Sequence, residues 1–173
     1  MNVKECDLPL ASAIDHRLVQ SAYFRDSYRA PLVNPRQDMV GIFFAIFGHQ
    51  PGWMKALLIA RNWIVSRCGL DVPAASDVMN VSRKARYQVG DTIGPWPIFS
   101  LTETELVAGR DNRHLDFRLS LLRVTHDGVP SVVVSTVCSV HNRSGKIYLF
   151  FIVPFHKWGV KRLISKAMIA GRL

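Results

Sequence analysis

The feature that most constrains this fold is a change in hydrophobic periodicity after Trp96. From that point apolar and polar residues alternate in short segments separated by turn formers. The alternation predicts strands at residues 98–101, 103–108, 114–125, 131–141 and 146–153. Asp127-Gly128 is typical of a two-residue hairpin turn. Connections this short join antiparallel neighbours, because a parallel crossover needs about a dozen residues. The segment therefore predicts a meander.

Two earlier segments have the marks of helices. Asp38 is suited to cap the apolar run at residues 39–47, and Gly48 is suited to end it. Apolar residues then recur at helical spacing over residues 53–68. Mixed aromatic and charged residues over 23–33 predict a first strand that precedes both helices.

The last part of the chain predicts a long helix. Pro154 is placed to end the final strand and to begin this helix. Its apolar stripe is formed by Val160, Leu163, Ile164, Ala167 and Met168. An amphipathic helix after a one-sided sheet packs across that sheet. The expected fold class is α+β, with two short helices inserted early and a long C-terminal helix packed across an antiparallel sheet.

Polar turn formers over residues 70–95 predict a long loop with a short strand near 87–89. At 173 residues, 49% of them hydrophobic and 20% charged, the chain fits a single domain over residues 1–173. The first fifteen residues include acidic positions that a signal peptide lacks, which predicts a cytoplasmic protein. The longest apolar run, residues 39–47, is too short to span a bilayer.

Charge is distributed unevenly. The net charge is +9, and residues 128–173 contain seven Lys or Arg and no Asp or Glu. A basic end can attract an anionic membrane surface, or it can serve solubility alone. Nucleic-acid binding is disfavoured, because no recognised motif accompanies the charge.

Standard metal and cofactor signatures are absent from the sequence. The three cysteines include no CxxC pair, and the six histidines include no HExxH. There is also no GxGxxG fingerprint and no GxSxG elbow. We therefore expect neither a metal nor a cofactor.

Four polar residues are candidate catalytic residues. His114, Asp116 and Arg118 alternate with apolar residues, so a strand places them in one row, where they can orient a polar group or stabilise an anion. The alternative is a polar face with cross-strand ion pairs to Glu103 or Glu105. His156 lies where the predicted last strand becomes the terminal helix, from which it can reach a ligand, cap the helix or pair with a carboxylate such as Asp116.

Aromatic residues are candidates for a ligand cavity, because such cavities are mainly apolar and aromatic. Core packing is the alternative. The candidates are Trp53, Trp63, Trp96, Phe99, Tyr148, Phe150 and Trp158.

Three strings, ARNWIVSRCGL (60–70), ELVAGRDNRHLDFRLSL (105–121) and KIYLFFIVPFHK (146–157), resemble a bacterial family called domain of unknown function 2867. The resemblance implies a START/Bet v 1-like (SRPBCC) helix-grip fold. Family members occur alone or behind an NAD(P)-binding reductase-like domain, which implies a reductase-like partner.

START-like folds usually hold an apolar molecule between the sheet and the terminal helix. The leading hypothesis is therefore binding of a small hydrophobic or amphipathic ligand in such a cavity. The first alternative is a cofactor-independent cyclase-like or hydrolase-like enzyme that uses His114, Asp116 and Arg118. The second alternative is a membrane-surface docking module that uses the basic C-terminal region.

Overall fold

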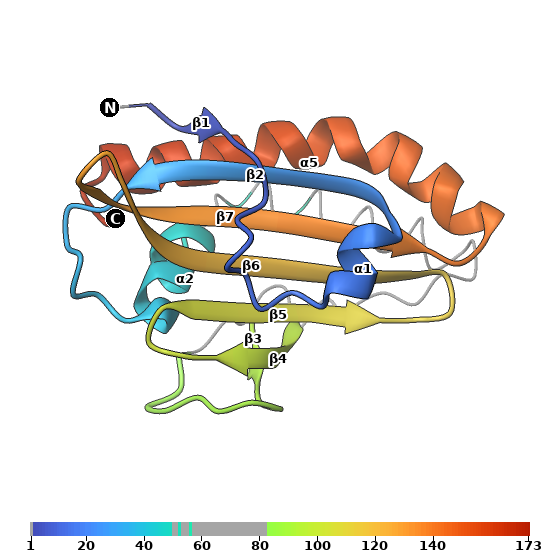
Figure 1. Ribbon diagram of the computed structural model, residues 1–173, viewed down its shortest axis with the longest axis horizontal. Helices are drawn as coiled ribbons and strands as arrows, with labels where there is room; N and C mark the ends of the chain where they lie inside the picture. The colour runs from blue at the N-terminus through green and yellow to red at the C-terminus, as the bar shows by residue number, and fades with distance from the viewer. Residues whose placement is uncertain (1, 50–51, 53–55, 57–82) are drawn as a thin grey trace.

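An antiparallel sheet of seven strands forms the centre of this computed structural model, which describes residues 2–49, 52, 56 and 83–173 (Figure 1). The order across the sheet is β1-β2-β7-β6-β5-β4-β3. The strands are β1 (Lys4–Glu5), β2 (Ala22–Pro31), β3 (Thr92–Ile93), β4 (Trp96–Leu101), β5 (Glu105–Asp111), β6 (Leu115–His126) and β7 (Val129–Val140). The described helices are α1 (His16–Gln20), α2 (Met39–Phe47) and α5 (Arg143–Ile169).

The predicted meander is confirmed from β4 to β7, where each strand pairs with the next one in the chain. Asp127 and Gly128 have φ values of 52° and 76°, the left-handed pair that a two-residue hairpin turn requires. The turn after β5 begins later than predicted, because Gly109 lies inside the strand. A Cβ atom on Gly109 would lie 2.0 Å from the carbonyl oxygen of Phe117, so only glycine fits there.

The predicted strand at residues 146–153 is wrong. Helix α5 begins at Arg143 and continues through Pro154, which lies inside the helix and not at its start. Asn142 caps the helix, its Oδ1 accepting a hydrogen bond from the Gly145 amide at 3.0 Å. The segment cannot extend the meander, because β7 already pairs with β2 on one side and with β6 on the other. Pro154 is exposed, so water can solvate the carbonyl group that it leaves without a helical donor.

Helices α2 and α5 pack on one face of the sheet, which we call the inner face. Helix α2 has the predicted bounds, and the Asp38 side chain accepts a hydrogen bond from the Gly41 amide. The predicted stripe of α5 is also confirmed, with Met168 at its margin. Its buried members are Val160, Leu163, Ile164 and Ala167. They join residues of β2, β6 and β7 in the main hydrophobic core.

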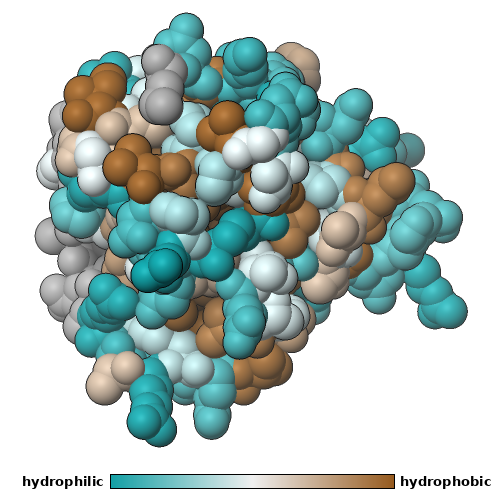
Figure 2. All heavy atoms as spheres, turned by 60° about the vertical axis from the view of Figure 1, so that its left-hand side comes forward, coloured by the Kyte–Doolittle hydropathy of each residue, from teal (hydrophilic) through white to brown (hydrophobic). Residues whose placement is uncertain are grey.

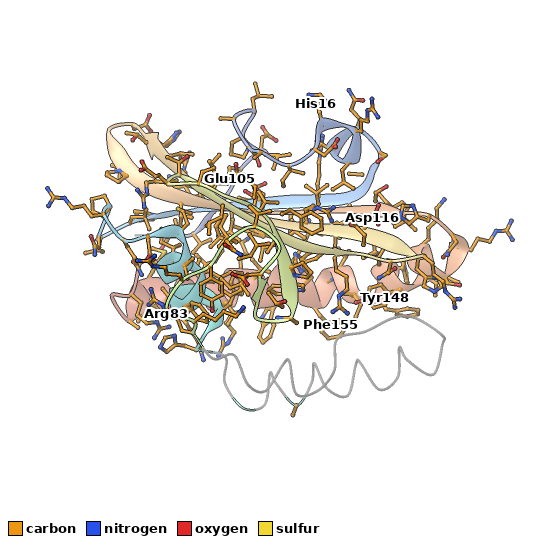
Figure 3. All side chains as sticks on the ribbon, turned by 90° about the horizontal axis from the view of Figure 1, so that it is seen from below. His16, Arg83, Glu105, Asp116, Tyr148 and Phe155 are labelled. Carbon is orange, nitrogen blue, oxygen red and sulfur yellow. The ribbon has the colours of Figure 1, made fainter. Side chains whose placement is uncertain are left out.

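Residues 6–21, including α1, cross the opposite face of the sheet, which we call the outer face (Figure 1). Figure 3 shows the sheet between these layers, with His16 on one side and Tyr148 and Phe155 on the other. A smaller apolar cluster of Ile14, Val107 and Val137 attaches the crossing segment to the sheet.

Other predicted elements have mixed outcomes. The strand predicted at residues 23–33 forms as β2. The helix predicted at residues 53–68 lies outside the described residues, as does most of the loop predicted at 70–95. Residues 87–89 form no strand, and the short strand β3 follows them instead. Within the described part of the chain, no helix is both long and apolar enough to cross a membrane.

Candidate functional site

Four polar side chains gather between the sheet and α5, and we call them the inner polar cluster. Asp26 and Tyr28 belong to β2, Thr136 to β7 and His156 to α5. Asp26 lies opposite Thr136 in the pairing of β2 with β7. Alternation along β2 places Asp26 and Tyr28 on the same face. The fold thus joins Asp26 to a histidine 130 positions away in sequence.

A histidine–carboxylate pair forms one side of the cluster. The Nε2 atom of His156 lies 3.3 Å from Oδ1 of Asp26. The Asp26 side chain is only 1% exposed, whereas that of His156 is 21% exposed. The Phe24 ring meets the imidazole edge-on at 5.6 Å and limits its orientation. The imidazole therefore connects a buried carboxylate with the boundary of the core.

Three further polar atoms of the cluster have no hydrogen-bond partner within the described part of the chain. They are Oδ2 of Asp26, the hydroxyl of Tyr28 and the hydroxyl of Thr136. All three residues are more than nine-tenths buried. A buried polar atom without a partner costs about 1–3 kcal/mol. Because such atoms are concentrated at one place, the inner polar cluster is a candidate binding site.

The protonation of the neighbouring acids follows from burial. Burial raises the pKa of Tyr28 far above its ordinary value, and so do the negative charge of Asp26 and the closeness of its carboxylate to the hydroxyl. The two groups do not meet the distance and angle of a full hydrogen bond, so the Tyr28 hydroxyl keeps its proton and remains a donor. Burial and the charge of Asp26 also raise the pKa of Cys138 to about 12. The cluster accordingly offers a hydroxyl donor at Tyr28, a carboxylate acceptor at Asp26 and a hydroxyl of either role at Thr136.

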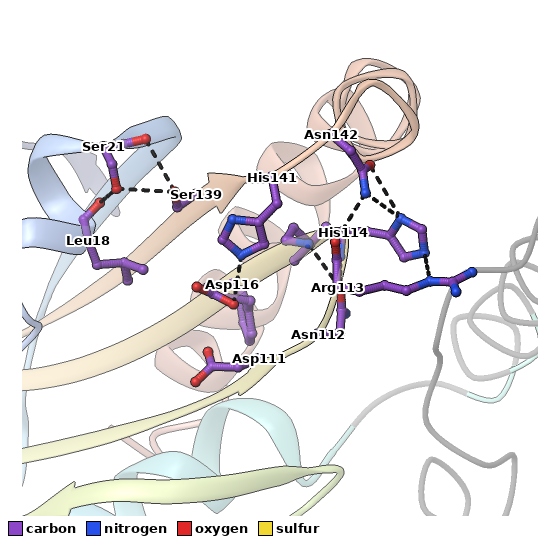
Figure 4. A network of polar contacts seen from close by, with 12 residues as sticks. Leu18, Ser21, Asp111, Asn112, Arg113, His114, Asp116, Ser139, His141 and Asn142 are labelled. Carbon is purple, nitrogen blue, oxygen red and sulfur yellow. Dashed lines mark hydrogen bonds and ion pairs between the residues drawn. The ribbon is translucent and has the colours of Figure 1, made fainter.

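His114, Asp116 and Arg118 each contact a different partner, and Figure 4 shows this for His114 and Asp116. His114 lies in the turn before β6, where its Nε2 atom accepts a hydrogen bond from Arg113 at 2.8 Å. Its Nδ1 atom faces the side-chain amide of Asn142, whose nitrogen lies 2.9 Å away.

The other two residues of the predicted row have partners of their own. Asp116 lies 3.1 Å from Nε2 of His141. Arg118 makes a two-pronged contact with Asp111, and its guanidinium carbon lies 3.6 Å from the centre of the Phe99 ring. These contacts attach side chains of neighbouring strands to one another.

The aromatic residues predicted to line a cavity lie in different parts of the structure. Trp96 packs on the inner face against Phe43, Phe47 and Phe117. Phe99 contacts Arg118 and is 41% exposed.

The aromatic candidates on α5 differ from one another in exposure. Tyr148 is half-buried, whereas Phe150 and Trp158 are exposed. Trp53 and Trp63 lie outside the described residues. The five described aromatic candidates therefore do not line one common cavity.

A model of the family described as "Protein of unknown function (DUF2867)" matches residues 18–163. The chain belongs to this family. The DUF2867 match covers most of the sheet and α5 as far as Leu163, and it includes all four residues of the inner polar cluster. No curated protein and no solved structure matches the chain.

A second candidate site lies mainly outside the DUF2867 match. A half-open hollow of about 600 Å³ separates the N-terminal segment from β2. Its lining includes Cys6, Leu8, His16 and Arg25. Burial raises the pKa of the Cys6 thiol. The N-terminal residues up to position 17, which form much of this hollow, precede the family match.

Sequence reasoning missed Asp26, Tyr28 and Thr136. One signal was available, because Asp26 falls between Phe24 and Tyr28 in the alternation of β2. An acidic residue in an otherwise aromatic row is unusual in a core, since a charge is costly to bury. The carboxylate partner considered for His156 was Asp116, whereas the structure pairs it with Asp26.

Proposed function

We propose that the chain binds a small, mainly apolar or amphipathic molecule between the sheet and α5. The observation that carries this proposal is the set of three buried polar atoms without partners at Asp26, Tyr28 and Thr136. Ligand sites in proteins are mostly apolar, with a few polar groups that orient the ligand. The inner polar cluster has this composition, since the hydrophobic core surrounds it.

The cluster favours a particular polar group on the ligand. The Asp26 carboxylate repels an anionic headgroup and accepts hydrogen bonds from a hydroxyl, an amide or an amine. The Tyr28 hydroxyl can donate to a carbonyl or ether oxygen of the same molecule. The proposed ligand is therefore neutral or cationic at its polar end.

A START-like helix-grip assignment accompanies this proposal. An extended antiparallel sheet with a long C-terminal helix against one face is the arrangement of that fold. In it the ligand lies between the sheet and the terminal helix, which is where the inner polar cluster lies. Fold likeness is an analogy, so the unpartnered atoms carry the functional argument.

Native mass spectrometry of the protein purified from its own host tests the proposal. The wild-type chain is expected to carry a small molecule that denaturing extraction releases. The double variant Tyr28→Phe/Thr136→Val removes two hydroxyls and is expected to lower its occupancy at least about tenfold, given the cost of lost polar contacts. Ser27→Ala is the matched control, since Ser27 bonds to Ser135 and not to the cluster. An unliganded wild-type mass, or equal occupancy in the folded double variant, rejects the proposal.

The pair formed by His156 and Asp26 favours a second candidate function, a cofactor-independent cyclase-like or hydrolase-like enzyme. Asp26 can orient the imidazole, which can then take a proton from the bound molecule or from water. In this version the chemistry depends on the inner polar cluster in place of His114, Asp116 and Arg118. Tyr28 can stabilise a developing negative charge on an oxygen.

Comparison of the extracts from wild type and His156→Gln tests the enzyme. A catalytic imidazole predicts that the variant accumulates a molecule that wild-type protein, when added, converts to a second product. His141→Gln is the control, because His141 pairs with Asp116 and not with the cluster. If both extracts contain the same molecule and wild-type protein does not convert it, the enzyme hypothesis is rejected and the binding proposal stands.

A further inference from the structure

The N-terminal half of α5 exposes a row of large apolar side chains. Ile147 is 61% exposed, Phe151 63%, Phe155 72% and Trp158 51%. Their spacing of four, four and three residues places them on one side of a helix. Phe150, which is 73% exposed, adjoins this row. We call these five residues the α5 stripe.

The stripe points away from the sheet. Leu149, Val160 and Ile164 are buried on the side of α5 that packs on the sheet, and helical geometry places the stripe opposite them. Figure 3 shows Phe155 on the side of α5 that is turned away from the strands. On the face of the molecule that Figure 2 shows, apolar side chains also reach the surface, and hydrophilic side chains lie around them. Isolated exposed apolar residues need no explanation, but a helical row of five does.

Basic side chains flank the stripe at both of its ends. Arg143 and Lys146 lie at its N-terminal end, and Lys157, Lys161 and Arg162 lie at its C-terminal end; all five are exposed. The Arg162 guanidinium lies 5.4 Å from the centre of the Trp158 ring. No Asp or Glu occurs between residues 128 and 173, so α5 itself contributes no negative charge. Glu5 of β1 lies 3.8 Å from the ammonium of Lys157 and offsets that one cation in part.

An aromatic row beside cations is typical of a helix that lies in the surface of an anionic membrane. The rings enter the boundary between headgroups and acyl chains, and the cations bind phosphates. A second copy of the chain fits less well, because a two-fold contact through this face would oppose like charges.

We propose that α5 docks the protein on an anionic phospholipid bilayer through the α5 stripe and the flanking basic residues. This proposal goes beyond ligand binding, and none of its test residues contacts the inner polar cluster. Failure of one proposal therefore does not decide the other.

Vesicle co-sedimentation with the full chain tests the docking. The probes are vesicles of phosphatidylcholine alone and of phosphatidylcholine mixed with phosphatidylglycerol. The wild type is expected to bind only the mixed vesicles, and to bind them less as salt is raised. Phe151→Ser/Phe155→Ser and Arg143→Gln/Lys146→Gln/Arg162→Gln are each expected to reduce binding, the second by roughly 100-fold because each cation contributes several-fold.

Matched controls separate docking from general changes in polarity or charge. Leu10→Ser/Val33→Ser removes two exposed apolar side chains outside α5, and Arg25→Gln/Arg36→Gln/Arg86→Gln removes three exposed cations outside α5. Both controls are expected to bind the mixed vesicles within about threefold of wild type, since only unspecific long-range attraction is lost.

Three results would overturn the proposal: no vesicle binding by wild type, equal binding to both vesicle types at all salt concentrations, or equal losses in variants and controls. A dimer in light scattering that Phe151→Ser/Phe155→Ser dissociates, without vesicle binding, would assign the stripe to a second copy of the chain.

Discussion

The two faces of the sheet differ in whether their buried carboxylates have a full set of hydrogen-bond partners. On the outer face Glu105 is 3% exposed, and its carboxylate accepts hydrogen bonds from the Ser12 hydroxyl, the Ser120 hydroxyl and the Ala13 amide, each at 2.6 Å. On the inner face Asp26 is almost as buried, but one of its oxygens and two neighbouring hydroxyls have no partner in the described part of the chain.

Buried polar groups can therefore have two roles: some connect elements of the fold, and others are available to a ligand. A satisfied network attaches one element to another, and here Glu105 attaches the N-terminal segment to β5 and β6. An unsatisfied cluster costs stability in the ligand-free protein, and this cost is the basis of the binding proposed above. The contrast between the two faces leads to three expected outcomes.

Loss of the Glu105 carboxylate is expected to have the largest effect. Glu105→Ala removes a carboxylate that accepts three hydrogen bonds, and a hydrogen bond to a charged group contributes about 1.5–3 kcal/mol. The total loss is smaller than the sum, because the N-terminal segment can move and let water reach the freed donors. We expect the free energy of unfolding, measured by urea denaturation, to fall by about 3 kcal/mol. A loss below about 1 kcal/mol would show that the network is not structural, and the contrast between the faces would fail.

The second expected effect is a loss of stability at high pH. The folded-state pKa of Cys138 is about 12, against an ordinary value of 9.0. Between these pH values the unfolded chain releases the thiol proton while the folded chain keeps it. The Cys138 thiol should therefore lower the free energy of unfolding by up to about 1.4 kcal/mol for each pH unit between its two pKa values.

Cys138→Ala is expected to flatten this decrease in urea denaturation at successive pH values. Cys6→Ala is the control from the outer face, and because Cys6 is only partly buried it should change the slope less. An identical slope in wild type and Cys138→Ala would contradict a closed, apolar inner face at Cys138.

Removal of the unpartnered hydroxyls is expected to have the smallest effect, in the opposite direction. Tyr28→Phe/Thr136→Val removes two buried groups without partners, so the ligand-free protein should gain about 1 kcal/mol of stability. Thermal and urea denaturation of ligand-free protein measure this gain. A loss of similar size would mean that both hydroxyls are already satisfied in the folded chain, and the binding argument would lose its basis.

Local signals predicted some elements well. The cap at Asp38 and the stop at Gly48 predicted α2, and Asp127-Gly128 predicted the hairpin between β6 and β7. These features depend on backbone geometry within a few residues, so sequence alone is sufficient for them. The stripe from Val160 to Ala167 was likewise predicted, because a helix with one buried side has a period that sequence displays.

Residues 146–153 illustrate the opposite case. The run is apolar at nearly every position and matches a strand and a helix equally well. Only the sheet decides between them, because β2 and β6 occupy both edges of β7 and leave the next segment no adjacent edge.

Local patterns in the sequence were enough to predict the α+β class, the meander from β4 to β7 and the basic, acid-free C-terminal region, because periodicity, turn chemistry and charge are local properties. The tertiary structure alone decided that β2 lies beside β7 and that α5 places His156 against Asp26. It also gave His114, Asp116 and Arg118 different partners, although Asp116 and Arg118 share the outer face of β6. The reason is physical: a site made by strand pairing and helix packing depends on contacts between distant segments, and no local pattern records which of those segments meet.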